Sequence, residues 1–197
     1  MASEEKAFEI ITEICTKNFD SQGYKCPMDI ALDIMQHPEF PMHNYAHHYL
    51  VPAVLLTALQ KKRSAEGSKF SEELEIVKKR AQEVLPAFCG THGTCGAAIG
   101  VGIFFSVITK TTPLSKDTWS LCNRATAESL REMADVGGPR CCKRNAFIAI
   151  RYATKTVLDE FGCDLSCPEE IKCSFGKYNL ECLEEDCPFY KDNKHVV

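Results

Sequence analysis

Apolar residues recur every three to four positions along nearly the whole chain, with polar residues between them. The first such stretch follows Ser3-Glu4-Glu5, a sequence that suits the start of a helix. Its apolar positions are Ala7, Phe8, Ile11, Ile14 and Cys15. This period is typical of a helix with one face toward a core. No strand-like alternation of useful length and no internal repeat accompanies it, so the pattern predicts an all-α protein.

The interruptions of this period delimit the other helices. Cys26-Pro27 precedes a short helix, because proline is tolerated in the first turn. Gly137-Gly138-Pro139 separates the last two helices, and Gly162 suits the end of the last. Pro52 removes one backbone donor and should kink the helix that contains it. The predicted helices after the first cover residues 28–36, 43–63, 71–85, 95–108, a segment that includes 119–133, and 140–161.

The segment 95–108 differs from the others because nearly every residue in it is apolar or small, including Gly96, Gly100 and Gly102. This composition predicts a central helix that is buried on all sides, with small residues that let neighbouring backbones approach closely. Its 14 residues are too few to cross a bilayer. We therefore expect no membrane interaction.

The chain divides at about residue 161. At 197 residues it is long enough for one domain with its own core. We expect a single helical domain over residues 1–161. Residues 162–197 form a short, polar, mostly irregular appendage that is rich in cysteine and has no apolar run long enough to bury itself. An interaction other than a hydrophobic core of its own must therefore order this appendage.

Charge and cysteine content narrow the function. The net charge of −4 argues against general nucleic-acid binding, although residues 138–156 hold five basic residues and no acidic one. The first residues lack a secretory pattern, so we expect a cytoplasmic protein. A reducing cytosol keeps thiols free, and the 12 cysteines then indicate metal binding or redox chemistry rather than disulfides.

Four cysteines form the first candidate site. Cys95 and the adjacent pair Cys141 and Cys142 stand at predicted helix N-termini, where the positive dipole end can lower the pKa of a thiol. Cys89 lies across a glycine loop from Cys95. We expect these four cysteines to form a catalytic or redox site. The alternative is that they are small buried residues at tight helix contacts. The residues that could bind an anionic substrate there are His92, Arg140, Lys143 and Arg144.

The appendage carries the second candidate site. Its cysteines are Cys163, Cys167, Cys173, Cys182 and Cys187. A segment without its own core needs a metal or crosslinks, because ordering each residue costs on the order of 1–2 kcal/mol. The spacing lacks the C-x2-C pair typical of zinc sites, and proline follows the last cysteine, as in some iron–sulfur proteins. We predict a [4Fe-4S] cluster, with zinc as the alternative.

Two histidines are additional candidate metal ligands. His43 and His47 are four residues apart and would share one face of a helix. No glutamate lies between them as in the zinc-protease motif. The alternative is that they are packed polar groups bonded to the backbone.

Four segments of the chain resemble an uncharacterised cysteine-rich domain family of anaerobic archaea and bacteria, sometimes fused to a methyltransferase-like domain. They are residues 43–58 (HNYAHHYLVPAVLLTA), residues 89–102 (CGTHGTCGAAIGVG), Thr112-Pro113-Leu114, and residues 137–144 (GGPRCCKR). The resemblance implies a lineage and an anaerobic setting that favours oxygen-sensitive clusters. It implies no specific activity.

The leading hypothesis is an iron–sulfur protein that delivers electrons, sulfur or clusters to a protein partner, such as a redox or methyltransferase-type enzyme. A second hypothesis is a zinc-stabilised adaptor without chemistry of its own. A third is a cysteine-dependent metalloenzyme that acts on a small anionic substrate. The sequence leaves open whether the protein is an enzyme, and it does not determine the oligomeric state.

Overall fold

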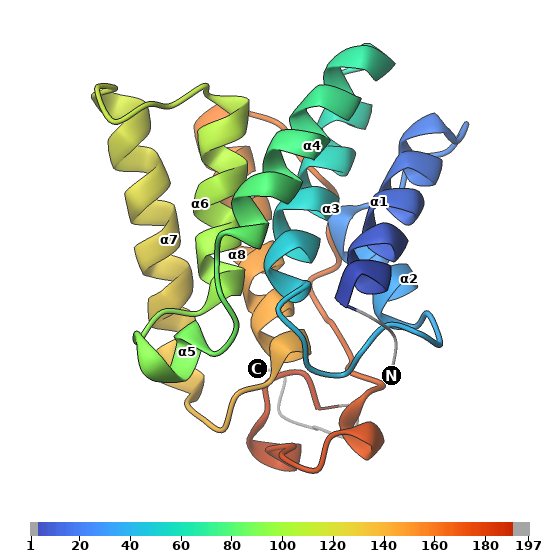
Figure 1. Ribbon diagram of the computed structural model, residues 1–197, viewed down its shortest axis with the longest axis vertical. Coiled ribbons are helices and arrows are strands. Elements are labelled where there is room, and N and C mark those ends of the chain that lie inside the picture. Colours follow the sequence, from blue (N-terminus) through green and yellow to red (C-terminus); the bar gives the residue numbers. More distant parts are fainter. Residues whose placement is uncertain (1–3, 191–197) are drawn as a thin grey trace.

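The computed structural model describes residues 4–190, and these residues form an all-α fold (Figure 1). The helices are α1 (Glu4–Asp20), α2 (Pro27–Met35), α3 (His47–Lys62), α4 (Gly67–Gln82), α5 (Phe88–Thr91), α6 (Gly96–Ile108), α7 (Asp117–Val136) and α8 (Cys142–Phe161). Two 3-10 turns, η1 (Gly176–Tyr178) and η2 (Glu184–Asp186), follow. Among the described residues the only β interaction is an isolated bridge between Cys173 and Tyr190. The predicted fold class is confirmed.

Two helices share the centre of the bundle. α3 packs against α1, α2, α4, α6 and α8, and α6 packs against α3, α4, α7 and α8. As predicted, α6 is mostly buried, but α3 is buried still more completely, from His47 through Gln60 with only one residue partly exposed. α7 lies at one side of the bundle, and α1 with α2 lies at the other (Figure 1).

The glycines of α6 explain how the two central helices come so close. A Cβ atom at Gly100 would lie 2.9 Å from Cδ of Pro52 and 3.0 Å from the backbone oxygen of His48, both in α3. At Gly102 it would lie 2.2 Å from Oγ1 of Thr126 in α7. α6 therefore approaches α3 and α7 through surfaces that have no side chain.

Several predicted helix boundaries need correction. α3 begins at His47, so His43 lies in the turn before it, and the helix continues without a break through Pro52. α4 begins at Gly67 rather than at residue 71. α8 ends at Phe161, and Gly162 follows in the left-handed conformation (φ +62°) that was expected for its C-terminal stop.

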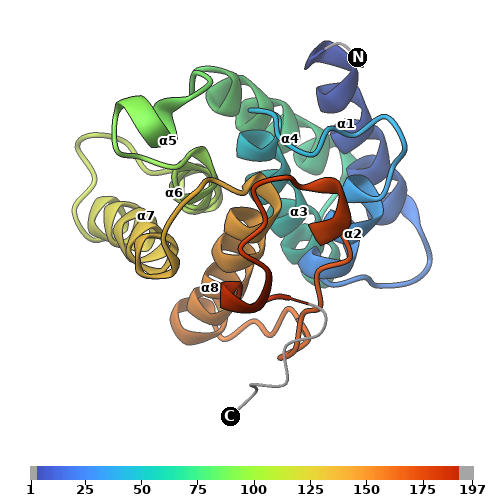
Figure 2. The same cartoon turned by 90° about the horizontal axis from the view of Figure 1, so that it is seen from below.

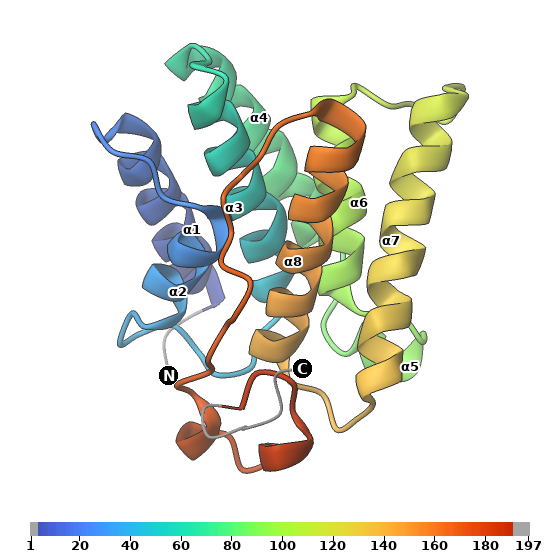
Figure 3. The same ribbon diagram turned by 180° about the vertical axis from the view of Figure 1, so that it is seen from behind.

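The segment after α8 runs back along the bundle. It leaves one end of α8, passes beside α2 and α3, and reaches the opposite end of the bundle, where η1 and η2 lie below the start of α8 (Figures 2 and 3). Single apolar side chains hold it. They are Leu165, Ile171, Phe175 and Phe189, all buried in the same hydrophobic cluster as the helices. The hydroxyl of Tyr24 also donates to the backbone oxygen of Leu165 at 2.8 Å.

None of the helices within residues 4–190 combines the length and the apolar content that a membrane span requires.

Candidate metal centre

Four cysteines from two parts of the chain line one small cavity. Cys141 precedes α8, and Cys173, Cys182 and Cys187 come from the segment after it. The cavity has a volume of about 20 Å³, which is space for about one water molecule. Its wall is completed mainly by apolar side chains and by Arg144. We call it the four-cysteine cavity.

All four sulfur atoms of this cavity accept a backbone hydrogen bond from a residue shortly after the cysteine. Cys141 accepts from the amide of residue 144, Cys173 from that of residue 175, and Cys182 from that of residue 184, each at 3.4 Å. Cys187 interacts in the same way with the amide of residue 189. Such N–H···S bonds stabilise a thiolate and tune a bound metal. The local backbone therefore supplies each sulfur with a donor.

The positive charges near the cavity come from the first turn of α8. Arg144 is buried, and its guanidinium donates to the backbone oxygen atoms of Gly137 at 2.7 Å and Pro139 at 2.9 Å. Burial raises the pKa of Cys173 and of Cys187, and Arg144 acts in the opposite direction on Cys187. Without a metal these thiols hold their protons at neutral pH, so a metal that binds them must displace protons.

Three other cysteines meet beside the start of α6. Cys95 is the N-cap residue of α6, and Asn145 donates to its sulfur at 3.3 Å. Cys95 interacts electrostatically with both Cys89 and Cys142. Cys89 and Cys142 also line a cavity of about 290 Å³. We call these three residues the Cys142 group.

The predicted lowering of thiol pKa at helix N-termini does not hold for this group. The pKa of Cys95 and that of Cys142 are raised, because burial outweighs the hydrogen bonds that favour the thiolate. For Cys142 these include the backbone amide of Asn44, and Arg140 adds a charge with its guanidinium 3.8 Å from the sulfur. The two thiols are therefore protonated at neutral pH.

A further cysteine set lies at the start of α2. Cys26 caps α2, accepts a hydrogen bond from the amide of Asp29 at 3.4 Å and interacts with Cys167. Cys163 and Cys167 both interact electrostatically with the neighbouring Tyr24. The shared hydrogen bond lowers the pKa of Cys26 and raises that of Cys167. We call Cys26, Cys163 and Cys167 the Cys26 group.

The structure thus divides the five cysteines of the predicted appendage site. α8 is about 30 Å long, since it has 20 residues at about 1.5 Å each. Cys163 follows its C-terminal end, whereas Cys141 marks its N-terminal end. Cys173, Cys182 and Cys187 lie with Cys141, and Cys163 and Cys167 lie with Cys26. The predicted four-cysteine catalytic set is divided as well, because Cys141 lines the four-cysteine cavity, although it also interacts electrostatically with Cys142.

The predicted substrate-binding residues do not form one site. Arg140 lies at the Cys142 group, but Lys143 and Arg144 turn away from it and are buried. Successive residues of a helix point in directions about 100° apart, so neighbours in the first turn of α8 serve different cavities. His92 is exposed, and its ring lies against that of Phe88 at a centroid distance of 4.2 Å.

The two predicted histidine ligands have different hydrogen-bond partners. The Nε2 atom of His43 bonds Oδ1 of Asn179 at 3.0 Å, and Nδ1 of His47 bonds the backbone oxygen of Asn44 at 2.9 Å. Burial holds the pKa of His47 well below its ordinary value. Nδ1 of His43 and Nε2 of His47 are buried and have no hydrogen-bond partner among residues 4–190. The two rings do not share a helix face, since α3 begins only at His47.

Two cysteines belong to no group. Cys15 is fully buried in α1 and interacts with Thr57, and Cys122 in α7 lies 3.6 Å from Oγ1 of Thr111. These two fit the alternative of small buried residues in the core. None of the 12 cysteines forms a disulfide.

Within residues 4–190, no three or more His, Cys, Asp or Glu side chains are arranged as direct ligands of a single metal ion. Sequence reasoning missed the part that Cys26 plays, although its position before Pro27 marked it as a helix cap. It also missed the pairing of Cys141 with the appendage, for which residue spacing carries no signal.

Residues 11–190 match a family of unknown function, DUF5714. The chain belongs to this family. The match covers every cysteine group and the whole described part of the appendage. Neither a curated protein nor a solved structure matches the chain.

Proposed function

We propose that the protein binds an iron–sulfur cluster in the four-cysteine cavity and uses it to deliver electrons, sulfur or clusters to a partner protein. The observation that carries the proposal is the convergence of Cys141, Cys173, Cys182 and Cys187 on one cavity, each with a backbone amide directed at its sulfur. Four cysteine thiolates are the ligand set of a [4Fe-4S] cluster.

Residue spacing supports a cluster over a single zinc ion, because the chain lacks a C-x2-C pair and Pro188 follows Cys187. A tetrahedral zinc site has Zn–S bonds of about 2.3 Å and therefore S–S distances of about 3.8 Å. No set of side chains in the described part of the chain has the arrangement for one ion. A [4Fe-4S] cluster holds its four thiolates farther apart, because each thiolate binds a different iron atom. A cluster core of eight atoms is larger than the present void of about 20 Å³, so the segments that carry Cys173, Cys182 and Cys187 would move outward on binding.

The electrostatics of the cavity favour an anionic centre. Four thiolates bring more negative charge than a cluster core neutralises. Arg144 lies in the cavity wall, Lys143 interacts electrostatically with Cys141 and Cys173, and the amides at the N-terminus of α8 face the same region. These groups offset the charge that the cluster would place in a buried position.

The Cys142 group supports a transfer role. Cys141 and Cys142 are consecutive, so the proposed cluster and the Cys142 group are joined by one peptide bond. Cys89 is exposed at the surface, where a partner protein can reach it. We propose that this group is a thiol redox site or a second ligand set. A reducing cytoplasm and the anaerobic setting that the sequence resemblance implies would both preserve such a system, and a redox or methyltransferase-type enzyme would be its partner.

The test is the metal and sulfide content of protein purified under strictly anoxic conditions. We expect about four iron atoms and four sulfides per chain, together with a brown colour. Cys141→Ser and Cys173→Ser should abolish most of the iron content. Cys122→Ser is the matched control, because Cys122 is buried outside every cysteine group and already pairs with a hydroxyl.

Cys163→Ser distinguishes two ligand sets: the four cysteines of the cavity, and the five cysteines that follow α8 in the sequence. If the five appendage cysteines shared one centre, this variant would lose iron; we expect it to keep the wild-type content, because Cys163 lies at the other end of α8 from Cys141. Negligible iron and sulfide in the wild-type protein would reject the proposal. Stoichiometric zinc in a colourless protein would replace it with the zinc-stabilised adaptor.

A further inference from the structure

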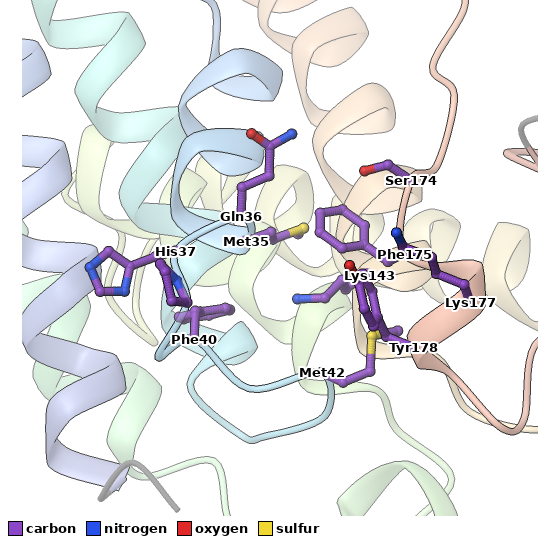
Figure 4. Close-up of a pocket in the computed structure, with 11 residues that line it drawn as sticks. Met35, Gln36, His37, Phe40, Met42, Lys143, Ser174, Phe175, Lys177 and Tyr178 are labelled. Atoms are coloured by element: carbon purple, nitrogen blue, oxygen red, sulfur yellow. The ribbon is translucent and has the colours of Figure 1, made fainter.

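A pocket of about 520 Å³ lies beside the four-cysteine cavity. Its walls come from three segments: residues 35–42 at the end of α2 and after it, Lys143 in the first turn of α8, and residues 174–178 in the appendage. Figure 4 shows side chains from these three segments facing a common space. The volume is within the range of pockets that bind small molecules.

The lining of this pocket is positively charged. It contains Lys143 and Lys177 but no aspartate or glutamate, although the whole chain has a net charge of −4. Aromatic rings form much of the remaining wall, and they belong to Phe40, Phe175 and Tyr178. The pocket therefore combines cationic groups with flat apolar surfaces.

Lys143 is the notable member of the lining because its charge is buried. The residue is only 2% exposed. Its ammonium donates to the backbone oxygen of Pro41 at 3.3 Å and lies 5.1 Å and 4.7 Å from the ring centroids of Phe40 and Phe175. Within residues 4–190 no carboxylate forms an ion pair with it. An ammonium group has three N–H donors. The contacts described here therefore leave donor capacity for an anionic partner.

Burial deprives the ammonium of Lys143 of most of its contact with water. A buried cation is costly unless it is paired and hydrogen-bonded. A ligand with a negative charge would supply the missing pair.

We propose that this pocket binds a small aromatic carboxylate, with the carboxylate on the ammonium of Lys143 and the ring between Phe40, Phe175 and Tyr178. A carboxylate suits the site better than a phosphate, because most of the wall is apolar and one lysine supplies the buried charge. Lys177 adds a second positive charge to the lining. A ligand of this class would satisfy the charge and the apolar walls together.

The ligand would lie next to the proposed cluster. Met42 lines both the pocket and the four-cysteine cavity, and Lys143 interacts electrostatically with cysteines of that cavity. The inference rests on the proposed function in one respect: the wall at residues 174–178 lies between Cys173 and Cys182, so the proposed centre would hold that wall in place.

Calorimetric titration of the metal-containing protein with benzoate tests the inference. Benzamide is the neutral isostere, and acetate carries the charge without the ring. We expect saturable benzoate binding at low millimolar concentration or below, and binding of benzamide and acetate at least about tenfold weaker. Lys143→Met keeps the apolar stem and should weaken benzoate binding by about thirtyfold or more, as loss of one partner from a buried charge pair does.

Two variants control this experiment. Lys155→Met removes an exposed lysine of the same helix outside the pocket and should leave benzoate binding unchanged. Tyr178→Ala removes an aromatic wall residue that is 65% exposed, so its folding is not at risk. It should weaken benzoate binding about threefold or more through the lost ring contact. This variant keeps the test decisive if Lys143→Met does not fold.

Three results would overturn the inference: no saturable benzoate binding up to 5 mM, equal binding of benzamide, or unchanged binding in both pocket variants. Iron and sulfide are measured on the same samples. Absence of benzoate binding in protein with full iron and sulfide content overturns the inference and leaves the proposed function standing. If anoxically purified protein binds benzoate but contains negligible iron and sulfide, the pocket is supported, and the missing iron and sulfide reject the proposed function.

Discussion

A close approach of the two central helices at Gly100 gives a quantitative test of the fold. In Gly100→Ala the new methyl group would lie 2.9 Å from Cδ of Pro52 and 3.0 Å from the backbone oxygen of His48. Neither obstacle can rotate away, since one belongs to a proline ring and the other to the backbone of α3. The methyl group therefore requires α3 and α6 to separate.

The size of the effect follows from two opposing terms. Alanine is more favourable than glycine inside a helix by about 1 kcal/mol. Inserting a methyl group into a closely packed core costs typically 1–3 kcal/mol, and the upper part of this range applies because the obstructing atoms are fixed. We expect Gly100→Ala to lower the free energy of unfolding by about 1–2 kcal/mol. For a chain of this size that corresponds to a fall in Tm of roughly 2–8 °C.

The assay is thermal unfolding followed by circular dichroism, with metal content matched between samples. Gly67→Ala is the control, because Gly67 begins α4 and a Cβ atom there would meet nothing within 4 Å. It should leave Tm unchanged or raise it slightly, by up to about 1 kcal/mol in stability. A Gly100→Ala protein as stable as Gly67→Ala would show that α6 does not pack against α3 as closely as described, and would refute the reasoning.

Three further predictions concern titratable groups. Burial holds the pKa of His47 below its ordinary value of 6.5, so below about pH 6.5 the unfolded chain takes up a proton that the folded chain does not. The contribution of His47 to stability should be complete above that pH and fall by up to about 1.4 kcal/mol per pH unit below it. In urea unfolding at several pH values, His47→Gln should reduce the slope of the unfolding free energy against pH by about one proton. Burial raises the pKa of Cys15 to about 12, whereas Cys89 is exposed. Mass spectrometry after brief iodoacetamide treatment of the native protein should therefore find Cys89 alkylated and Cys15 unmodified. Equal labelling of the two cysteines would contradict the described burial. Burial also raises the pKa of Cys173 and of Cys187, so metal that reloads the metal-free protein must displace their protons. The apparent affinity for the metal should fall about tenfold or more per pH unit from pH 8.5 to 6.5. A pH-independent affinity would mean that these thiols are not ligands.

Local features of the sequence determined the helices and several of their ends. A 3.6-residue period depends only on neighbours along one helix, so it predicted the all-α class and most segments. Gly162 ends α8 because glycine adopts the left-handed conformation at little cost. The small residues of the segment 95–108 predicted close helix contacts, and the packing of α6 on α3 and α7 agrees with this. The start of α3 was wrong because residues 43–46 form a turn that the apolar period does not reveal.

Only the tertiary structure decided which cysteines meet. Residue spacing grouped the five cysteines after α8 together, but the chain returns along that helix between Cys163 and Cys173 and thereby separates the first two cysteines from the last three. Likewise Cys141 and Cys142 are adjacent in sequence yet serve different groups, and Lys143 turns into a third space, because each step along a helix rotates the side chain by about 100°. The kinds of ligand atom were therefore readable from the amino-acid sequence. Their partners were not, because partners are fixed by the packing of helices and by the return path of a segment that has no period of its own.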